Sequence, residues 1–146
     1  MKKIIFYAMS CWMAGNLLAA GDNWLTSVPQ AKTQAQAEKK LILLDFTGSD
    51  WCSWCKKLDK ETFSKPEFQS YAKSNLVLVE VDFPTSKPQT PELKTANAAL
   101  QEKYHVSGYP TLVALKPDGT VVWTQEGYRA GGPPAMIAQL EEAKKK

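Results

Sequence analysis

The sequence predicts an α/β domain with a central mixed β-sheet flanked by helices. Two continuous apolar runs, Leu41–Phe46 and Leu76–Asp82, are typical of strands buried on both faces. Helical segments alternate with them, which favours parallel pairing. Two later strands are joined by the turn residues 116–119, which predicts an antiparallel hairpin. Together these observations give a sheet with both parallel and antiparallel pairs, covered by helices.

Each expected element has a local reason. Ser27 is a suitable N-cap for the first helix, and Pro91 suits the first turn of a later one. Three prolines between residues 83 and 91 predict an irregular loop. In chain order we expect a helix over 29–40, a strand over 41–46, a helix over 52–62 continued over 63–72 after a break near Pro66, a strand over 76–82, a helix over 91–104, strands over 111–115 and 120–124, and a helix from 135 to the end.

The N-terminus has the pattern of a secretory signal peptide. Lys2 and Lys3 precede an apolar run from Ile4 to Leu18, and small residues follow it up to Ala20. We therefore expect a signal peptide over residues 1–20, cleaved after Ala20, and a single domain over residues 21–146. An uncleaved N-terminal anchor is the alternative.

The positions of the cysteines favour redox chemistry over structural cross-linking. Cys11 falls inside the signal run, where a lipid anchor is a weaker alternative to removal with the signal. Cys52 and Cys55 then remain, and they close too small a loop to act as a useful staple. A structural zinc site needs four ligands, and His105 is the one histidine of the chain. We therefore expect no metal and no cofactor, and a redox-active pair.

The two cysteines are expected to have different roles. Cys52 stands where a strand gives way to a helix, so unpaired N–H groups and the helix dipole favour its thiolate. Lys56 and Lys57 add positive charge in the first helical turn. Cys52 is therefore the expected nucleophile, and Cys55, one turn deeper, is the expected resolving cysteine.

Several neighbours are candidates for supporting roles. Asp45 lies in the apolar strand that leads to the pair, and burial would raise its pKa and suit it to proton transfer with Cys55. A partly exposed strand-end aspartate is the alternative. Trp51 and Trp54 could offer an apolar surface to a partner or simply pack in the core. The Tyr109–Pro110 bond is a candidate cis peptide at a tight turn.

These residues together resemble thioredoxins over nearly all of residues 21–146. The resemblance rests on Asp45-Phe46, Trp51-Cys52-x-x-Cys55-Lys56, Val106-Ser107-Gly108-Tyr109-Pro110-Thr111, the Pro117-Asp118-Gly119 turn and Gly127. The segment from Cys55 to Phe68 is similar to the periplasmic C-terminal domain of DsbD-type disulfide interchange proteins and to small exported thioredoxin-like reductases or isomerases. The resemblance implies a thioredoxin fold, a buried Asp45, and a cis Pro110 that faces the cysteines.

The resemblance also implies a substrate-binding surface, and three departures from it concern this site. Asp45 lies one residue further from the first cysteine than in cytosolic thioredoxins. Substrate contacts are expected from Trp51, Trp54, Tyr109, Pro110 and Gly127. Leu78 stands where cytosolic thioredoxins carry a lysine beside the buried aspartate, so that cation is missing. The loop from Phe83 to Pro91 is longer than theirs, and it either shapes the choice of partner or is a solvated insertion.

The sequence therefore predicts an exported thiol–disulfide oxidoreductase that exchanges electrons with protein disulfides, as a reductase or isomerase. A dithiol oxidase, and a module that binds copper or a partner without turnover, are the alternatives. The net charge of +3 gives no reason to expect nucleic acid as a partner. We expect protein thiols and disulfides as partners, an electron donor in the membrane or envelope, and no stable membrane insertion after signal removal.

Overall fold

The computed structural model describes residues 23–146. The expected signal peptide over residues 1–20, its cleavage after Ala20, and Cys11 lie outside the described residues. Within residues 23–146, none of the helices combines the length and the apolarity needed to cross a membrane.

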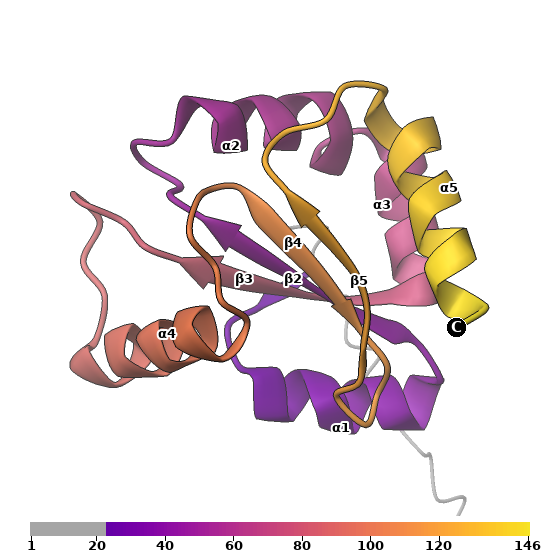
Figure 1. Cartoon of the computed structure of the whole chain (residues 1–146), viewed down its shortest axis with the longest axis horizontal. Helices are drawn as coiled ribbons and strands as arrows, with labels where there is room; N and C mark the ends of the chain where they lie inside the picture. Colours follow the sequence, from indigo (N-terminus) through magenta and orange to yellow (C-terminus); the bar gives the residue numbers. More distant parts are fainter. Residues whose placement is uncertain (1–22) are drawn as a thin grey trace, which may run out of the picture.

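A five-stranded mixed sheet forms the centre of the domain (Figure 1), in the order β1-β3-β2-β4-β5. The pairs β1–β3 and β3–β2 are parallel, and the pairs β2–β4 and β4–β5 are antiparallel. This confirms the predicted mixed sheet and the predicted hairpin. The strands are β1 (Trp24–Leu25), β2 (Leu41–Thr47), β3 (Leu76–Asp82), β4 (Thr111–Leu115) and β5 (Val121–Glu126).

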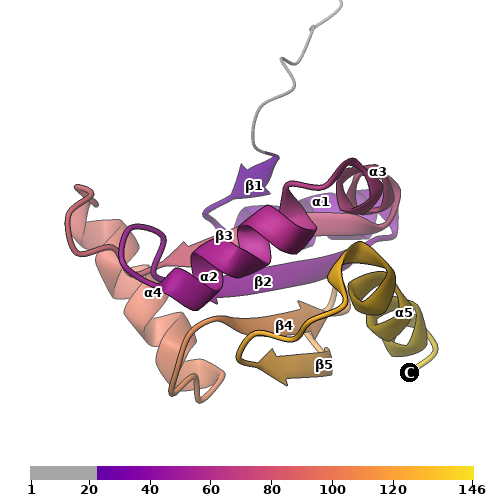
Figure 2. The same cartoon turned by 90° about the horizontal axis from the view of Figure 1, so that it is seen from above.

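Helices cover both faces of the sheet (Figures 1 and 2), as the strand patterns require. On one side, Ala31 and Ala35 pack with Ile42 and Leu44, and α1 and α4 cover this core. On the other side, Leu58 and Leu140 belong to a second core, covered by α2, α3 and α5. The helices are α1 (Val28–Glu38), α2 (Ser53–Leu58), the π-helix η1 (Asp59–Phe63), α3 (Pro66–Asn75), α4 (Pro91–Lys103) and α5 (Gly132–Lys144).

The alternation of side chains along β2 decides where Asp45 points. Ile42 and Leu44 belong to the core under α1, whereas Leu41 and Leu43 belong to the core under α2 and α3. Successive residues of a strand face opposite sides, so Asp45 lies on the face that Leu43 shares with α2. The sequence thus places this carboxylate on the same side of the sheet as the helix that carries the cysteines.

Three expectations about the elements were wrong in detail. The short strand β1 was missed, because two residues carry no periodic pattern. The helix expected over 52–62 is interrupted by η1, in which the Ser64 N–H donates to the Asp59 carbonyl at 2.8 Å, and α3 begins at Pro66 rather than near Phe63. Helix α5 begins at Gly132 and not at 135, because its two prolines occupy first-turn positions that need no N–H partner.

Candidate active site

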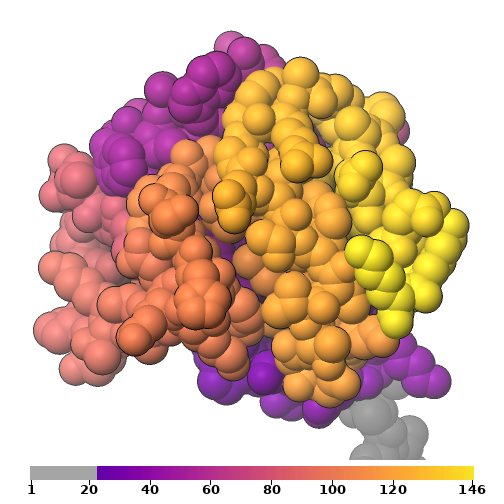
Figure 3. All heavy atoms as spheres, viewed as in Figure 1, coloured from indigo at the N-terminus to yellow at the C-terminus, as the bar shows by residue number. Residues whose placement is uncertain are grey.

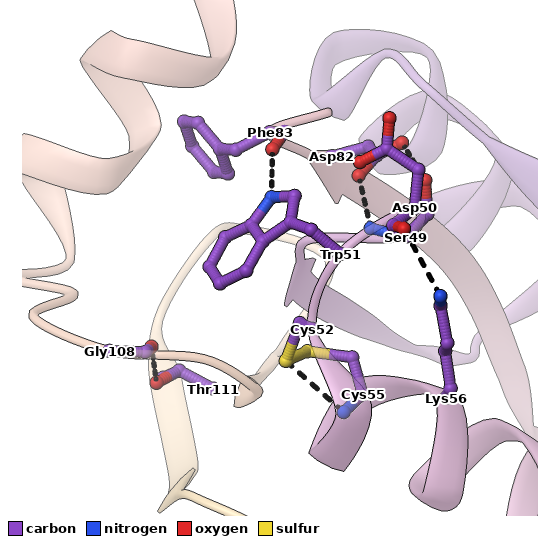
Figure 4. Close-up of a disulfide and its surroundings, with 10 residues drawn as sticks. All are labelled: Ser49, Asp50, Trp51, Cys52, Cys55, Lys56, Asp82, Phe83, Gly108 and Thr111. Carbon is purple, nitrogen blue, oxygen red and sulfur yellow. Dashed lines mark hydrogen bonds between the residues drawn. A yellow bond between two sulfur atoms is a disulfide. The ribbon is translucent and has the colours of Figure 1, made fainter. Parts of the chain in front are cut away.

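Cys52 and Cys55 form a disulfide at the start of α2 (Figure 4), with their Cα atoms 5.3 Å apart. Cys52 is the N-cap residue, in an extended conformation, and Cys55 lies within the helix. Each of the two residues is 6% exposed, so the pair is largely shielded from solvent. The structure therefore describes the oxidised form of the predicted dithiol.

The N-terminus of α2 provides a hydrogen bond to the sulfur of Cys52. The Cys55 backbone N–H donates to Cys52 Sγ at 3.2 Å. A free N–H at a helix start, together with the helix dipole, favours negative charge on the atom it faces. When the disulfide is reduced, this contact favours the thiolate at Cys52 over the thiolate at Cys55.

The side chains of the two lysines of this helix have partners of their own. Lys56 Nζ donates to the Asp50 carbonyl at 3.1 Å. Lys57 Nζ lies 5.3 Å from the centre of the Trp54 ring and 5.0 Å from that of Tyr128. Neither lysine contact involves a sulfur, whereas the helix start provides a hydrogen bond to Cys52 Sγ.

Asp45 is buried, with 8% of its surface exposed, and its Oδ1 has no hydrogen-bond partner. Burial, and in smaller measure the nearby Glu80, Asp59 and Asp82 carboxylates, raise the pKa of Asp45 to about 8. The alternative of a partly exposed strand-end aspartate is excluded. A carboxyl group with such a pKa is mostly protonated at neutral pH and has a minor ionised fraction that can take a proton from a thiol.

The neighbours of Asp45 on β3 include a carboxylate and an apolar side chain. The register places Asp45 directly opposite Glu80, and Leu78 two residues before it, on the same face of β3. Leu78 is 8% exposed and belongs to the core. The position where cytosolic thioredoxins are expected to have a lysine is thus occupied by Leu78, and the Glu80 carboxylate favours the protonated form of Asp45.

Hydrogen bonds hold the loop before β4 in place. The Tyr109–Pro110 peptide bond is cis, the isomer that the resemblance implies. The Gly127 N–H donates to the Pro110 carbonyl at 2.8 Å, with Gly127 at a φ of +74° that favours glycine. Thr111 Oγ1 donates to the Gly108 carbonyl at 2.8 Å (Figure 4). Pro110 and Gly127, predicted separately from the sequence, are therefore direct neighbours.

A first aromatic cluster adjoins Cys52, formed by Trp51, Phe83 and Tyr109. The ring centres of Trp51 and Tyr109 are 5.8 Å apart, and those of Phe83 and Tyr109 are 5.3 Å apart. The Tyr109 hydroxyl accepts from Gln101 Nε2 at 2.8 Å. Trp51 remains 47% exposed, so the core-packing alternative does not describe it.

A second aromatic cluster is formed by Trp54 and Tyr128. Their rings are stacked, with centres 5.4 Å apart, and Lys57 covers both. The Tyr128 hydroxyl donates to the Glu61 carboxylate, which fixes the tyrosine ring. Trp54 is 55% exposed, so it too is a surface residue beside the pair.

The sequence reasoning missed several members of this site. Phe83 and Tyr128 complete the two aromatic clusters, and Glu80 and Asp59 act on the pKa of Asp45. Glu80 could have been found, because it has the same strand parity as Leu78 and faces the same side. The others are brought in by loops and by the π-helix, for which the sequence gives no periodic signal. Over residues 23–146, the His, Cys, Asp and Glu side chains form no group of three or more that could hold a metal ion.

The sheet order and the dithiol at the start of α2 define a thioredoxin-fold protein with a redox-active pair of cysteines. Residues 28–144 match the family described as the thioredoxin-like domain. The chain belongs to the thioredoxin-like family.

The similarities to individual proteins are consistent with this family. The chain is 35% identical over 129 residues to the disulfide bond reductase DsbH of Chlamydia pneumoniae, covering 88% of this chain and 76% of that protein. It superimposes on a solved structure titled DsbH oxidoreductase with a TM-score of 0.77 at 34% identity, covering 84% of this chain and 83% of that one. It is also 33% identical over 82 residues to the thiol:disulfide interchange protein DsbD of Haemophilus influenzae, covering 56% of this chain but 13% of that protein.

Proposed function

We propose that this thiol–disulfide oxidoreductase is an exported enzyme that reduces disulfide bonds in other proteins. The observation that carries the proposal is the Cys52–Cys55 disulfide at the N-terminus of α2, with the Cys55 N–H directed at Cys52 Sγ. The similarity to a disulfide bond reductase over most of both chains supports the direction of electron flow.

The chemistry consists of two thiol–disulfide exchanges. In the reduced enzyme the Cys52 thiolate attacks one sulfur of a substrate disulfide, which forms a mixed disulfide and releases the first substrate thiolate. Cys55 then loses its proton and attacks Cys52 Sγ, which releases the second substrate thiolate. The substrate gains two electrons, and the enzyme is left with the Cys52–Cys55 disulfide that the structure describes. A dithiol electron donor returns the enzyme to the reduced form by the same exchange in reverse.

We propose that the ionised fraction of Asp45 accepts the Cys55 proton. Its pKa of about 8 lies close to the ordinary value of a thiol, about 8.5, so proton transfer between the two groups is nearly balanced in energy. A carboxyl group with an ordinary pKa would be a much weaker base toward a thiol. The burial of Asp45 therefore suits it to the resolving step.

The charges around the cysteine pair favour a reductase over a dithiol oxidase. A dithiol enzyme is a strong oxidant when its reduced thiolate is strongly stabilised. Here Cys52 Sγ accepts a hydrogen bond at the start of α2, whereas Lys56 and Lys57 contact other groups. Asp45 supplies no positive charge to the thiolate, and its ionised fraction opposes a second negative charge on the pair. Weak stabilisation of the thiolate favours an enzyme that gives its electrons away.

The two aromatic clusters are proposed to contact the substrate. Trp51 and Trp54 are the large exposed apolar side chains on either side of the buried disulfide. Tyr109, which contacts Trp51, and Pro110 and Gly127, which are joined by a hydrogen bond, are proposed to extend this surface. A protein chain that carries a disulfide could lie between the two clusters with its sulfur over Cys52.

The proposed location is the periplasm or cell envelope. The support is the positively charged, then apolar, then small-residue pattern of residues 1–20. Its partners there would be protein disulfides and a membrane or envelope electron donor, since this dithiol must be reduced again after each turnover. Mass spectrometry of the protein recovered from the envelope tests the proposed start of the mature chain at Gly21, and a chain that keeps residues 1–20 would contradict cleavage.

Insulin reduction in the presence of dithiothreitol tests the proposed activity. The wild-type protein is expected to accelerate precipitation of the insulin B chain, and Cys52→Ser is expected to abolish the acceleration because it removes the attacking sulfur. Ser53→Ala is a matched control, because this neighbouring hydroxyl is exposed and lies in the same helix. Equal rates for the wild-type protein and Cys52→Ser would contradict the proposal.

A further inference from the structure

A single carboxylate holds the long loop after β3. Asp50 Oδ2 accepts backbone N–H groups from Ser86 at 2.6 Å, Lys87 at 3.0 Å and Thr85 at 3.1 Å. Asp50 Oδ1 accepts from the Thr85 N–H at 3.0 Å. Three successive N–H groups that converge on one anion form a specific binding arrangement for a carboxylate. This exposed loop therefore has a defined anchor 35 residues away in the sequence.

A second set of contacts joins the same two segments. Asp82, at the end of β3, accepts from the Ser49 N–H at 2.9 Å and from the Ser49 hydroxyl at 2.5 Å (Figure 4). Lys87 Nζ donates to Ser49 Oγ at 3.0 Å. Gln89 and the buried Asn97 both donate to the Asp82 carbonyl, at 3.1 and 3.0 Å. Both ends of the loop are thus fastened beside the segment that leads into α2.

Trp51 connects these hydrogen-bonded segments to the disulfide. Its indole N–H donates to the Phe83 carbonyl at 2.8 Å, at the first residue of the loop (Figure 4). The indole also lies so close to Gly48 that a Cβ at residue 48 would overlap the ring. Trp51 directly precedes Cys52 and directly follows Asp50. The loop position and the orientation of the Trp51 ring are therefore set together.

We propose that Asp50 is a positioning residue, which holds residues 83–89 and the Trp51 ring as one wall of the partner-binding surface beside Cys52. Figure 3 shows the salmon atoms of this loop against the purple atoms of the segment that leads into α2. This inference rests on the proposed function, and it assigns a role to the insertion by which the chain departs from the cytosolic thioredoxins. The hydrogen bonds from the loop also lower the pKa of Asp50 to about 2, so the carboxylate stays charged at any pH at which the enzyme works.

The wall fits a polypeptide substrate rather than a small disulfide. The wall presents the half-exposed Trp51 ring and the exposed residues from Thr85 to Pro88. A substrate reaches these groups only if it has residues beyond the disulfide that Cys52 attacks. The wall therefore contributes to the binding of proteins, and its loss is expected to act mainly on KM.

Amide hydrogen exchange tests whether Asp50 holds the loop. Asp50→Asn keeps the side-chain size but removes the charge and one acceptor oxygen, so the amides of residues 85–87 and the Trp51 indole N–H are expected to exchange about ten-fold faster. Asp118→Asn is the matched control, because Asp118 is also an exposed carboxylate that accepts a backbone N–H, from Thr120 at 2.8 Å, in the hairpin after β4. Unchanged exchange in Asp50→Asn would overturn the proposal.

Insulin kinetics test whether the wall binds partners. Asp50→Asn is expected to raise KM about five-fold and to lower kcat by a smaller factor, since uniform binding is lost while the cysteines remain. Asp118→Asn is expected to change neither constant. Faster exchange with an unchanged KM would overturn the partner-binding role. A wild-type protein that fails to reduce insulin would contradict the proposed function, and the exchange data would still decide whether Asp50 holds the loop.

Discussion

Replacing Asp45 with asparagine preserves the size of the side chain and removes its ionisable proton. Asp45 has a pKa of about 8 in the folded protein, against an ordinary value of 3.8, and burial is the main cause. The folded state therefore keeps a proton that the unfolded state releases between these two values. Stability is full at low pH, where both states are protonated, and it falls as the pH rises toward 8.

The size of this effect follows from the two pKa values. Each pH unit between them costs the folded state about 1.4 kcal/mol, so the wild-type protein is expected to lose about 4 kcal/mol between pH 5 and pH 8 relative to Asp45→Asn. Above pH 8 both states are ionised, and the difference becomes constant. Asp45→Asn is thus expected to be the more stable protein at neutral pH, because it avoids the cost of burying an ionisable carboxyl group.

Urea unfolding of the oxidised proteins at pH 5, 6, 7, 8 and 9 measures this difference. The disulfide form is used because its cysteines do not titrate. Asp118→Asn serves as the control: the hydrogen bond from Thr120 lowers the pKa of that exposed carboxyl, so its difference from the wild-type protein is expected to stay flat above pH 5. A flat difference for Asp45→Asn over the same range would refute the reasoning, since it would mean an ordinary pKa in the folded state.

Two further predictions concern packing. Gly48→Ala is expected to displace the Trp51 ring and break its hydrogen bond to the Phe83 carbonyl, at a cost of about 1 kcal/mol in the free energy of unfolding. A shift of the indole N–H resonance in the NMR spectrum would report the displacement. An unchanged resonance would contradict the close approach of Trp51 to Gly48. Leu140→Ala is expected to lower the free energy of unfolding by about 2–5 kcal/mol, because the fully buried side chain leaves a cavity. The exposed neighbour Gln139→Ala is its control in the same urea titration, and equal losses for both would contradict the assigned core.

The fold could be predicted from the sequence wherever a pattern extends over many residues. The apolar runs of β2 and β3 and the turn at residues 116–119 identified the sheet, and Asp45 could be placed by strand alternation. The strand β1 and the π-helix η1 could not, because two paired residues and one wide helical turn leave no periodic signal.

The sequence predicts only the part of the site that lies within the short segment around the two cysteines. Cys52, Cys55 and the two tryptophans lie within one short segment, so their proximity follows from the chain itself. The anchor between Asp50 and residues 85–87 joins positions 35 or more residues apart, and the neighbours Phe83 and Tyr128 are brought in by the fold. Such contacts depend on tertiary packing and have no counterpart in local sequence.

The reduction potential of the Cys52–Cys55 pair distinguishes a disulfide reductase from a dithiol oxidase. Equilibration of the purified protein with glutathione or dithiothreitol buffers, read by the fraction of free thiols, gives the value. We expect a potential near that of thioredoxin, about −270 mV, because the Cys52 thiolate is weakly stabilised and several carboxyl groups surround Asp45. A potential near −120 mV, typical of a dithiol oxidase, would contradict it.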